Sequence, residues 1–203
     1  MSSESGRSRS LPPGPRRLLG IYLNDHYAGS AGGIALVRRM ARVHHGAAAG
    51  PRLEALADEI AEDRESLVEI MVALDVRVKR ARNVAVRLAE KVGRAKPNGR
   101  LISRSPLSDV LELEALRLGV EGKLALWRTL AHVARTDDRI DSAAVDRLAA
   151  RAERQIRQLE DMRLAAVDRT FAPDTRAALH EAKAEATRHD RMRHPFHRAG
   201  WAS

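Results

Sequence analysis

The sequence predicts an all-α protein, folded as an antiparallel bundle of four long helices. Aromatic residues make up only 3% of the 203 residues, and the chain is rich in Ala, Leu, Arg and Glu, which favour helices over strands. Four long stretches carry apolar residues at three- and four-residue steps, the spacing that lines up one face of a helix. The chain has no cysteine, so disulfides, iron–sulfur clusters and thiolate chemistry are excluded within it.

The first half of the chain is predicted to form two long helices and one short one. The first starts at residue 15 or 16 and runs to about 45, before the stop signal Gly46. The second spans about residues 51–74, with a proline that suits a first helical turn and acidic side chains near its start. A short basic helix is predicted over about residues 77–94, inserted before a Lys-Pro-Asn-Gly break.

Two further long helices are predicted in the second half. Ser105 followed by Pro106 reads as an N-cap and a first helical residue, and that helix continues to about residue 134. Asp141 or Ser142 can cap the fourth long helix, which runs to about residue 170. A polar segment, residues 174–193, is predicted to be a frayed or loosely docked helix.

This pattern divides the chain into three parts. We expect a disordered N-terminal tail (1–15), the helical bundle (16–172), and a polar C-terminal helix and tail (173–203). The longest nearly apolar run, residues 28–37, is far shorter than the roughly 20 residues that a transmembrane helix needs. No export signal is recognisable near the start, so a cytoplasmic location is expected.

Each predicted inward face contains a polar group. The face of the first helix is predicted to hold Leu19, Tyr22, His26, Gly29, Gly33, Leu36, Met40 and Val43. The second face is predicted to hold Leu53, Leu56, Ile60, Asp63, Leu67, Ile70 and Leu74. The fourth is predicted to hold Leu148, Ala152, Gln155, Leu159, Met162 and Ala166. The third long helix offers two neighbouring rows, one with Leu107, Leu111, Glu114, Leu118, Glu121 and Ala125, and one with Leu113, Leu116, Val120 and Trp127.

Polar groups converging from four helices suggest a carboxylate-bridged metal centre, because a buried carboxylate must be paired, metal-bound or protonated. The candidate metal ligands are Asp25, His26, Glu59, Glu62, Asp63, Glu114 and Glu121. Two alternatives stay open. An arginine can reach in to satisfy these groups, the candidates being Arg38, Arg64, Arg117 and Arg163, or the helical register is displaced by one residue.

Three stretches resemble uncharacterised bacterial proteins of the ferritin-like class. They are IYLNDHYAG (21–29), EIAEDR (59–64) and ELEALRLGVEGK (112–123). The resemblance covers about residues 16–170 and implies a four-helix bundle with one long connection, without a demonstrated activity. Metal-binding ferritin-like proteins use a carboxylate from two helices and a Glu-x-x-His pair from each of the other two. Here Glu59 is followed three residues on by Glu62, and Glu62 by Glu65, so the ligand set is incomplete.

The positive charge of the chain is concentrated in one segment. Residues 76–104 hold ten cations and one acid, a net +9 that equals the charge of the whole chain, whereas residues 52–75 carry a net −6. The predicted short helix is amphipathic, which suits an anionic lipid surface or a phosphate backbone. Its candidate polyanion-binding residues are Arg77, Lys79, Arg80, Arg82, Arg87, Lys91 and Arg94. Alternatively, its cations pair with the acidic surface of residues 54–75.

The sequence is therefore compatible with three functions. The first is a non-catalytic ferritin-like bundle protein, which can be a homo-oligomer and has no cofactor. The second is a carboxylate-bridged di-metal protein, with iron or manganese as the cofactor. The third is a protein that binds nucleic acid or lipid headgroups through its basic segment.

Overall fold

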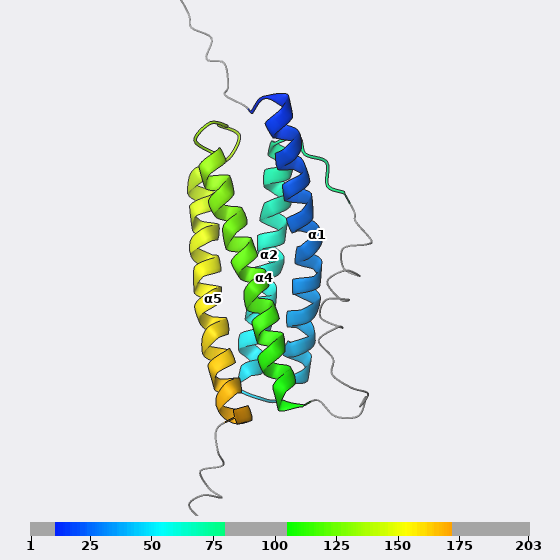
Figure 1. Cartoon of the computed structure of the whole chain (residues 1–203), viewed down its shortest axis with the longest axis vertical. Coiled ribbons are helices and arrows are strands. Elements are labelled where there is room, and N and C mark those ends of the chain that lie inside the picture. The colour runs from blue at the N-terminus through cyan, green and yellow to red at the C-terminus, as the bar shows by residue number, and fades with distance from the viewer. Residues whose placement is uncertain (1–10, 80–104, 172–203) are drawn as a thin grey trace, which may run out of the picture.

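The computed structural model describes residues 11–79 and 105–171, which form four long helices and no strand (Figure 1). They are α1 (Pro13–Val43), α2 (Ala49–Ala73), α4 (Pro106–Val133) and α5 (Ser142–Phe171). The prediction of an all-α protein is thus confirmed for the described residues. Each long helix ends within two residues of its predicted limit, while α1 begins two residues before the earliest predicted start.

The short basic helix is not observed where it was predicted to begin. Residues 76–79 leave α2 and have no helical hydrogen bonding, although the prediction placed the start of the helix at residue 77. The rest of that helix lies outside the described residues, as do residues 1–10 of the predicted tail and the C-terminal segment 174–193.

The helix ends follow the local signals in the sequence. The Ser105 side chain accepts a hydrogen bond from the backbone amide of Leu107, and Pro106 opens α4 behind it. Asp141 caps α5 in the same way by accepting from the amide of Ala144 at 3.0 Å. α2 ends where Asp75 takes a positive φ of 54°, which turns the chain back toward α1.

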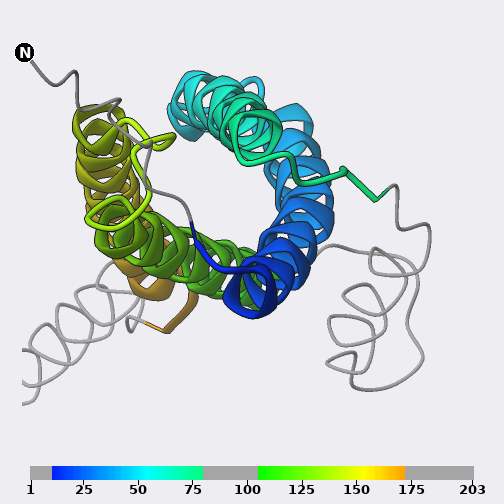
Figure 2. The same ribbon diagram turned by 90° about the horizontal axis from the view of Figure 1, so that it is seen from above.

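The helices surround one core, in the order α2, α1, α4 and α5 (Figure 2). α4 packs extensively against α5, and α1 packs against both α2 and α4. The backbones of α2 and α5 approach each other at few points, so long polar side chains bridge these two helices. The largest fully buried side chains in the core are Trp127, Leu23, Met40, Leu53, Leu56 and Met71.

The predicted inward faces of α2 and α5 are correct, the predicted face of α1 is displaced, and on α4 one of the two predicted rows faces the core. Every predicted residue on α5 is buried, and on α2 only Ile70 is half-buried. On α1 the register is displaced, because Leu23, Ala28 and Val37 are buried while Val43 is 49% exposed. On α4 the row with Trp127 faces the core, and the row with Glu114 and Glu121 faces away from it. Helix α4 carries leucines on both rows, so apolar spacing alone could not decide between them.

No helix in the described ranges is long and apolar enough to cross a membrane.

Candidate functional site

A buried ionic cluster lies near the middle of the bundle, where α2, α4 and α5 meet. Asp63 of α2 and Gln155 of α5 are each only 1% exposed. The Lys123 ammonium reaches across from α4 and donates hydrogen bonds to Asp63 Oδ2 and to Gln155 Oε1. One cation therefore connects three helices inside the bundle.

Arg151 and two further carboxylates extend the ionic cluster toward the surface. The Gln155 amide donates to Glu59 Oε2 at 2.8 Å, and Arg151 Nη1 donates to Glu62 Oε2 at 2.7 Å. Arg151 Nε lies 2.9 Å from Asp63 Oδ1, as an ion-pair contact that lacks the alignment of a hydrogen bond. Both oxygens of the buried carboxylate thus face a cation.

Burial acts against the charge of Lys123. Desolvation lowers the pKa of the Lys123 ammonium below its ordinary value, and the neighbouring Asp63 carboxylate opposes that shift. Removing Asp63 would leave the Lys123 ammonium with only the neutral Gln155 as its hydrogen-bond partner, which is far costlier than losing an exposed pair. The chemistry of the cluster is therefore that of a structural tie between helices.

The structure distributes the predicted metal ligands over different places. Glu59, Glu62 and Asp63 of α2 belong to the ionic cluster, where they meet Gln155, Arg151 and Lys123. Asp25 is exposed on α1, and the ring of His26 is half-buried with its centroid 4.6 Å from that of Tyr22. Glu114 lies 3.8 Å from Arg163, and Glu121 lies 3.4 Å from Arg117, both away from the core.

Within the described residues, no group of three His, Asp or Glu side chains is placed so that it could hold a metal ion. Arginines do satisfy some of the predicted ligands, since Arg117 and Arg163 pair with Glu121 and Glu114. Arg64 instead lies over the ring of Tyr27, 4.0 Å from its centroid.

Lys123 and Arg151 are the residues that sequence reasoning missed. A signal for Lys123 was present, because it continues the four-three-four spacing of Leu116, Val120 and Trp127, all buried. A single lysine within an apolar row indicates a buried cation that needs an acidic partner. Arg151 has no comparable signal, since it is one of many arginines beside the inward face of α5.

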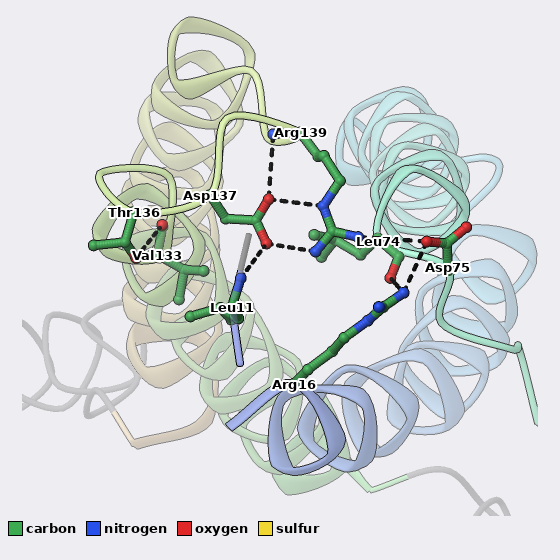
Figure 3. A network of polar contacts seen from close by, with 8 residues as sticks. All are labelled: Leu11, Arg16, Leu74, Asp75, Val133, Thr136, Asp137 and Arg139. Atoms are coloured by element: carbon green, nitrogen blue, oxygen red, sulfur yellow. Dashed lines mark hydrogen bonds and ion pairs between the residues drawn. The ribbon is translucent and has the colours of Figure 1, made fainter. Parts of the chain in front are cut away.

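A second polar network closes the end of the bundle where α1 begins and α2 ends (Figure 3). Asp137, in the loop between α4 and α5, is fully buried and accepts two hydrogen bonds from the Arg139 guanidinium, at 2.8 and 2.6 Å. Arg139 also lies 3.4 Å from Asp75, which Arg16 contacts at 2.8 Å. This end network of Asp137, Arg139, Asp75 and Arg16 joins the start of α1, the end of α2 and the loop between α4 and α5.

The end network also holds the start of the described chain. The backbone amide of Leu11 donates to Asp137 Oδ2 at 3.4 Å, and Arg16 donates to the carbonyl of Leu74 at 3.2 Å. Hydrogen bonds from Arg139 lower the pKa of the Asp137 carboxyl, against the opposing effect of burial.

Beside the end network lies a basic groove of about 470 Å³, between α1 and residues 76–79. Buried Asn24 of α1 forms this groove by binding the outgoing chain. Its amide donates to the Arg77 carbonyl at 3.1 Å, and its Oδ1 accepts from the Lys79 amide at 2.6 Å. Arg77 and Lys79 are thereby placed next to Arg16 and Arg17 along one groove.

Three of these four cations have no acidic partner among the described residues. Arg16 is paired with Asp75, whereas the side chains of Arg17, Arg77 and Lys79 are exposed and make no ion pair there. Of the predicted polyanion-binding residues, Arg77 and Lys79 thus lie in the groove. The other five, Arg80, Arg82, Arg87, Lys91 and Arg94, lie outside the described residues.

The comparisons with known proteins give no relative. No protein family, no curated protein and no solved structure matches this chain.

Proposed function

We propose that this protein is a non-catalytic helical bundle that binds the headgroups of anionic membrane lipids through its basic groove. The observation that carries the proposal is the binding of residues 77 and 79 by Asn24. It holds Arg77 and Lys79 along the same groove as Arg17, and none of these three cations makes an ion pair among the described residues. Cations that stay unpaired beside an open groove suit an external anion.

We also propose that the bundle is antiparallel and of the ferritin-like class. The support is the direction of its helices. Asp75 at the end of α2 pairs with Arg16 at the start of α1, and Asp109 at the start of α4 pairs with His44 at the end of α1. The connection from α2 to α4 therefore joins opposite ends of the bundle, and a single long connection of this kind is typical of ferritin-like folds.

Exposed aliphatic side chains favour lipid over nucleic acid as the partner. Ile21, which is 46% exposed, lines the groove, and Leu18, which directly follows the exposed Arg17, is 69% exposed. Surfaces that bind anionic membranes combine cations with aliphatic groups that enter the headgroup region. Binding to a phosphate backbone gains nothing from exposed leucine or isoleucine.

Sedimentation with vesicles tests the proposal. The chain should partition onto vesicles of phosphatidylserine and phosphatidylcholine, and not onto phosphatidylcholine alone. Each cation near such a surface contributes about 1 kcal/mol, so replacing Arg17, Arg77 and Lys79 by Gln should weaken partitioning by about two orders of magnitude. The matched control is Gln at Arg147, Arg154 and Arg157, three exposed arginines of α5 with no ion pair in the described structure.

A second variant distinguishes the two partner classes. Leu18→Ser with Ile21→Ser should weaken vesicle binding and leave binding to duplex DNA unchanged. If the protein binds DNA more tightly than vesicles, and the serine variant behaves like the wild type in both assays, the partner is nucleic acid. If replacing the three control arginines of α5 weakens vesicle binding as much as replacing the three groove cations, the basic groove is not the lipid-binding site.

A further inference from the structure

A small apolar pocket lies at the opposite end of the bundle from the basic groove. It has a volume of about 250 Å³ and is lined by residues from the end of α1, the start of α2, the start of α4 and the last turns of α5. Its floor consists of four core side chains, Met40, Leu53, Leu113 and Met162, each at most 6% exposed. Ala49 and Ala165 contribute small side chains to its lining, which leaves space that larger residues would fill.

Arg52, Arg169, His44 and Asp109 line the mouth of the apolar pocket. His44 Nε2 lies 3.1 Å from Asp109 Oδ1, and Arg169 lies 4.0 Å from Asp109 Oδ2. Arg52 lines the opening from α2, is exposed, and has no ion-pair partner in the described part of the chain. With Asp109 already engaged by His44 and Arg169, the mouth keeps an excess of positive charge over an apolar floor.

We propose that this pocket binds a small monocarboxylate with an apolar body, with the carboxylate at Arg52 and Arg169 and the body against the two methionines. The volume corresponds to about eight water molecules of roughly 30 Å³ each, so the ligand has about eight non-hydrogen atoms. An apolar cavity with a few convergent charged groups is typical of small-molecule sites. This inference is independent of the proposed lipid binding, which uses other residues at the other end of the molecule.

The methionines provide a direct measurement. With ¹³C-labelled methionine methyl groups, NMR titration with hexanoate should shift the signals of Met40 and Met162 in a saturable manner. Met71, which is fully buried and does not line the pocket, should not move. Hexylammonium, which has the same body and the opposite charge, should cause no saturable shift. Titration with benzoate distinguishes an aromatic from an aliphatic body.

Two kinds of variant locate the site. Ala165→Leu adds a side chain in the pocket and should abolish the shifts, whereas the control Ala150→Leu, at an exposed position of α5 outside the pocket, should not. If Ala165→Leu lowers the melting temperature, Ala48→Leu fills the same pocket from the α2 side. Replacing Arg52 and Arg169 by Gln should weaken hexanoate binding several-fold. Absence of saturable shifts at Met40 and Met162, or equal binding of hexylammonium, would overturn the proposal.

Discussion

At the centre of the bundle, the ammonium of Lys123 exchanges hydration for two oxygen acceptors, on Asp63 and Gln155. This exchange succeeds only while both acceptors are present, because an unpaired buried charge is far more costly than the pair is favourable. Lys123 of α4 therefore requires an acceptor on α2 and another on α5 at the same height in the bundle. An apolar side chain would pack against either helix without such a requirement.

Asp63→Ala should lower the free energy of unfolding by about 3–5 kcal/mol, because it leaves Lys123 without its carboxylate. The double variant Asp63→Leu with Lys123→Met should be more stable than Asp63→Ala, since it removes both charges together. Denaturant titrations of the three proteins measure this. Glu153→Ala, which breaks the exposed pair with Arg128, is the control and should cost less than about 1 kcal/mol. A double variant less stable than Asp63→Ala would contradict the interpretation.

Asp137 predicts a dependence of stability on pH. Its pKa in the folded protein is lowered from the ordinary value of 3.8 by hydrogen bonds from Arg139, so the unfolded chain binds the proton more readily. Its stabilising contribution is complete well above pH 3.8 and is lost as pH falls through the folded-state pKa. The difference in unfolding free energy between the wild type and Asp137→Asn should therefore shrink on acidification below pH 3.8. A difference that stays constant down to pH 2 would show that the charge is not responsible.

At the scale of the helix, α4 shows how far apolar spacing determines orientation. Its outward row carries three leucines that are 38%, 41% and 68% exposed, and its inward row carries Leu113, Leu116 and Trp127. The two rows differ in the charged residues that lie between their apolar side chains. The outward row contains Glu114 and Glu121, while the inward row contains a single charged side chain, Lys123, which has an acidic partner.

Leu116 and Leu118 form a matched pair for testing this register. Leu116 is 2% exposed, so Leu116→Ala should lower the free energy of unfolding by about 2–5 kcal/mol through lost burial and a cavity. Leu118 is 68% exposed, so Leu118→Ala should change it by less than about 0.5 kcal/mol. Thermal and denaturant unfolding of the two variants give the comparison. Equal destabilisation would mean that both rows are buried, for example in an oligomer.

The position of charged residues along each helix explains how much of the fold and of the site the sequence predicts. The inward face of α5 was predicted correctly because all arginines and acids of that helix lie outside the face. Asp63 was predicted to be buried because it lies on the same helical row as the apolar residues Leu56, Ile60 and Leu67 of α2. The partners of Asp63 could not be predicted, because which cation reaches it depends on the rotation of α4 relative to α2. In the basic groove, nothing in the sequence marks Asn24 as the residue that binds residues 77 and 79.

For the whole molecule, the arrangement of charges bears on metal binding. The three α2 carboxylates of the predicted ligand set face Lys123, Arg151 and Gln155, which a metal ion would have to displace. We therefore expect iron or manganese to leave the melting temperature unchanged. Elemental analysis of protein purified without chelator is the companion measurement. Retention of one or two ions per chain, with a higher melting temperature, would favour the di-metal alternative.

The two ends of the bundle carry separate networks, and this separation can be tested with one substitution. Arg139→Gln removes both charged hydrogen bonds to Asp137, which is fully buried, so it should destabilise the end network of Asp137, Asp75 and Arg16. Hydrogen exchange should accelerate at the amides of residues 11–20 and 76–79. The basic groove shares Arg16 and Asp75 with this network, so vesicle binding should weaken. The apolar pocket shares no residue with it, and hexanoate shifts at Met40 and Met162 should persist. Loss of hexanoate binding in this variant, with the fold intact, would show that the ends are coupled along the helices.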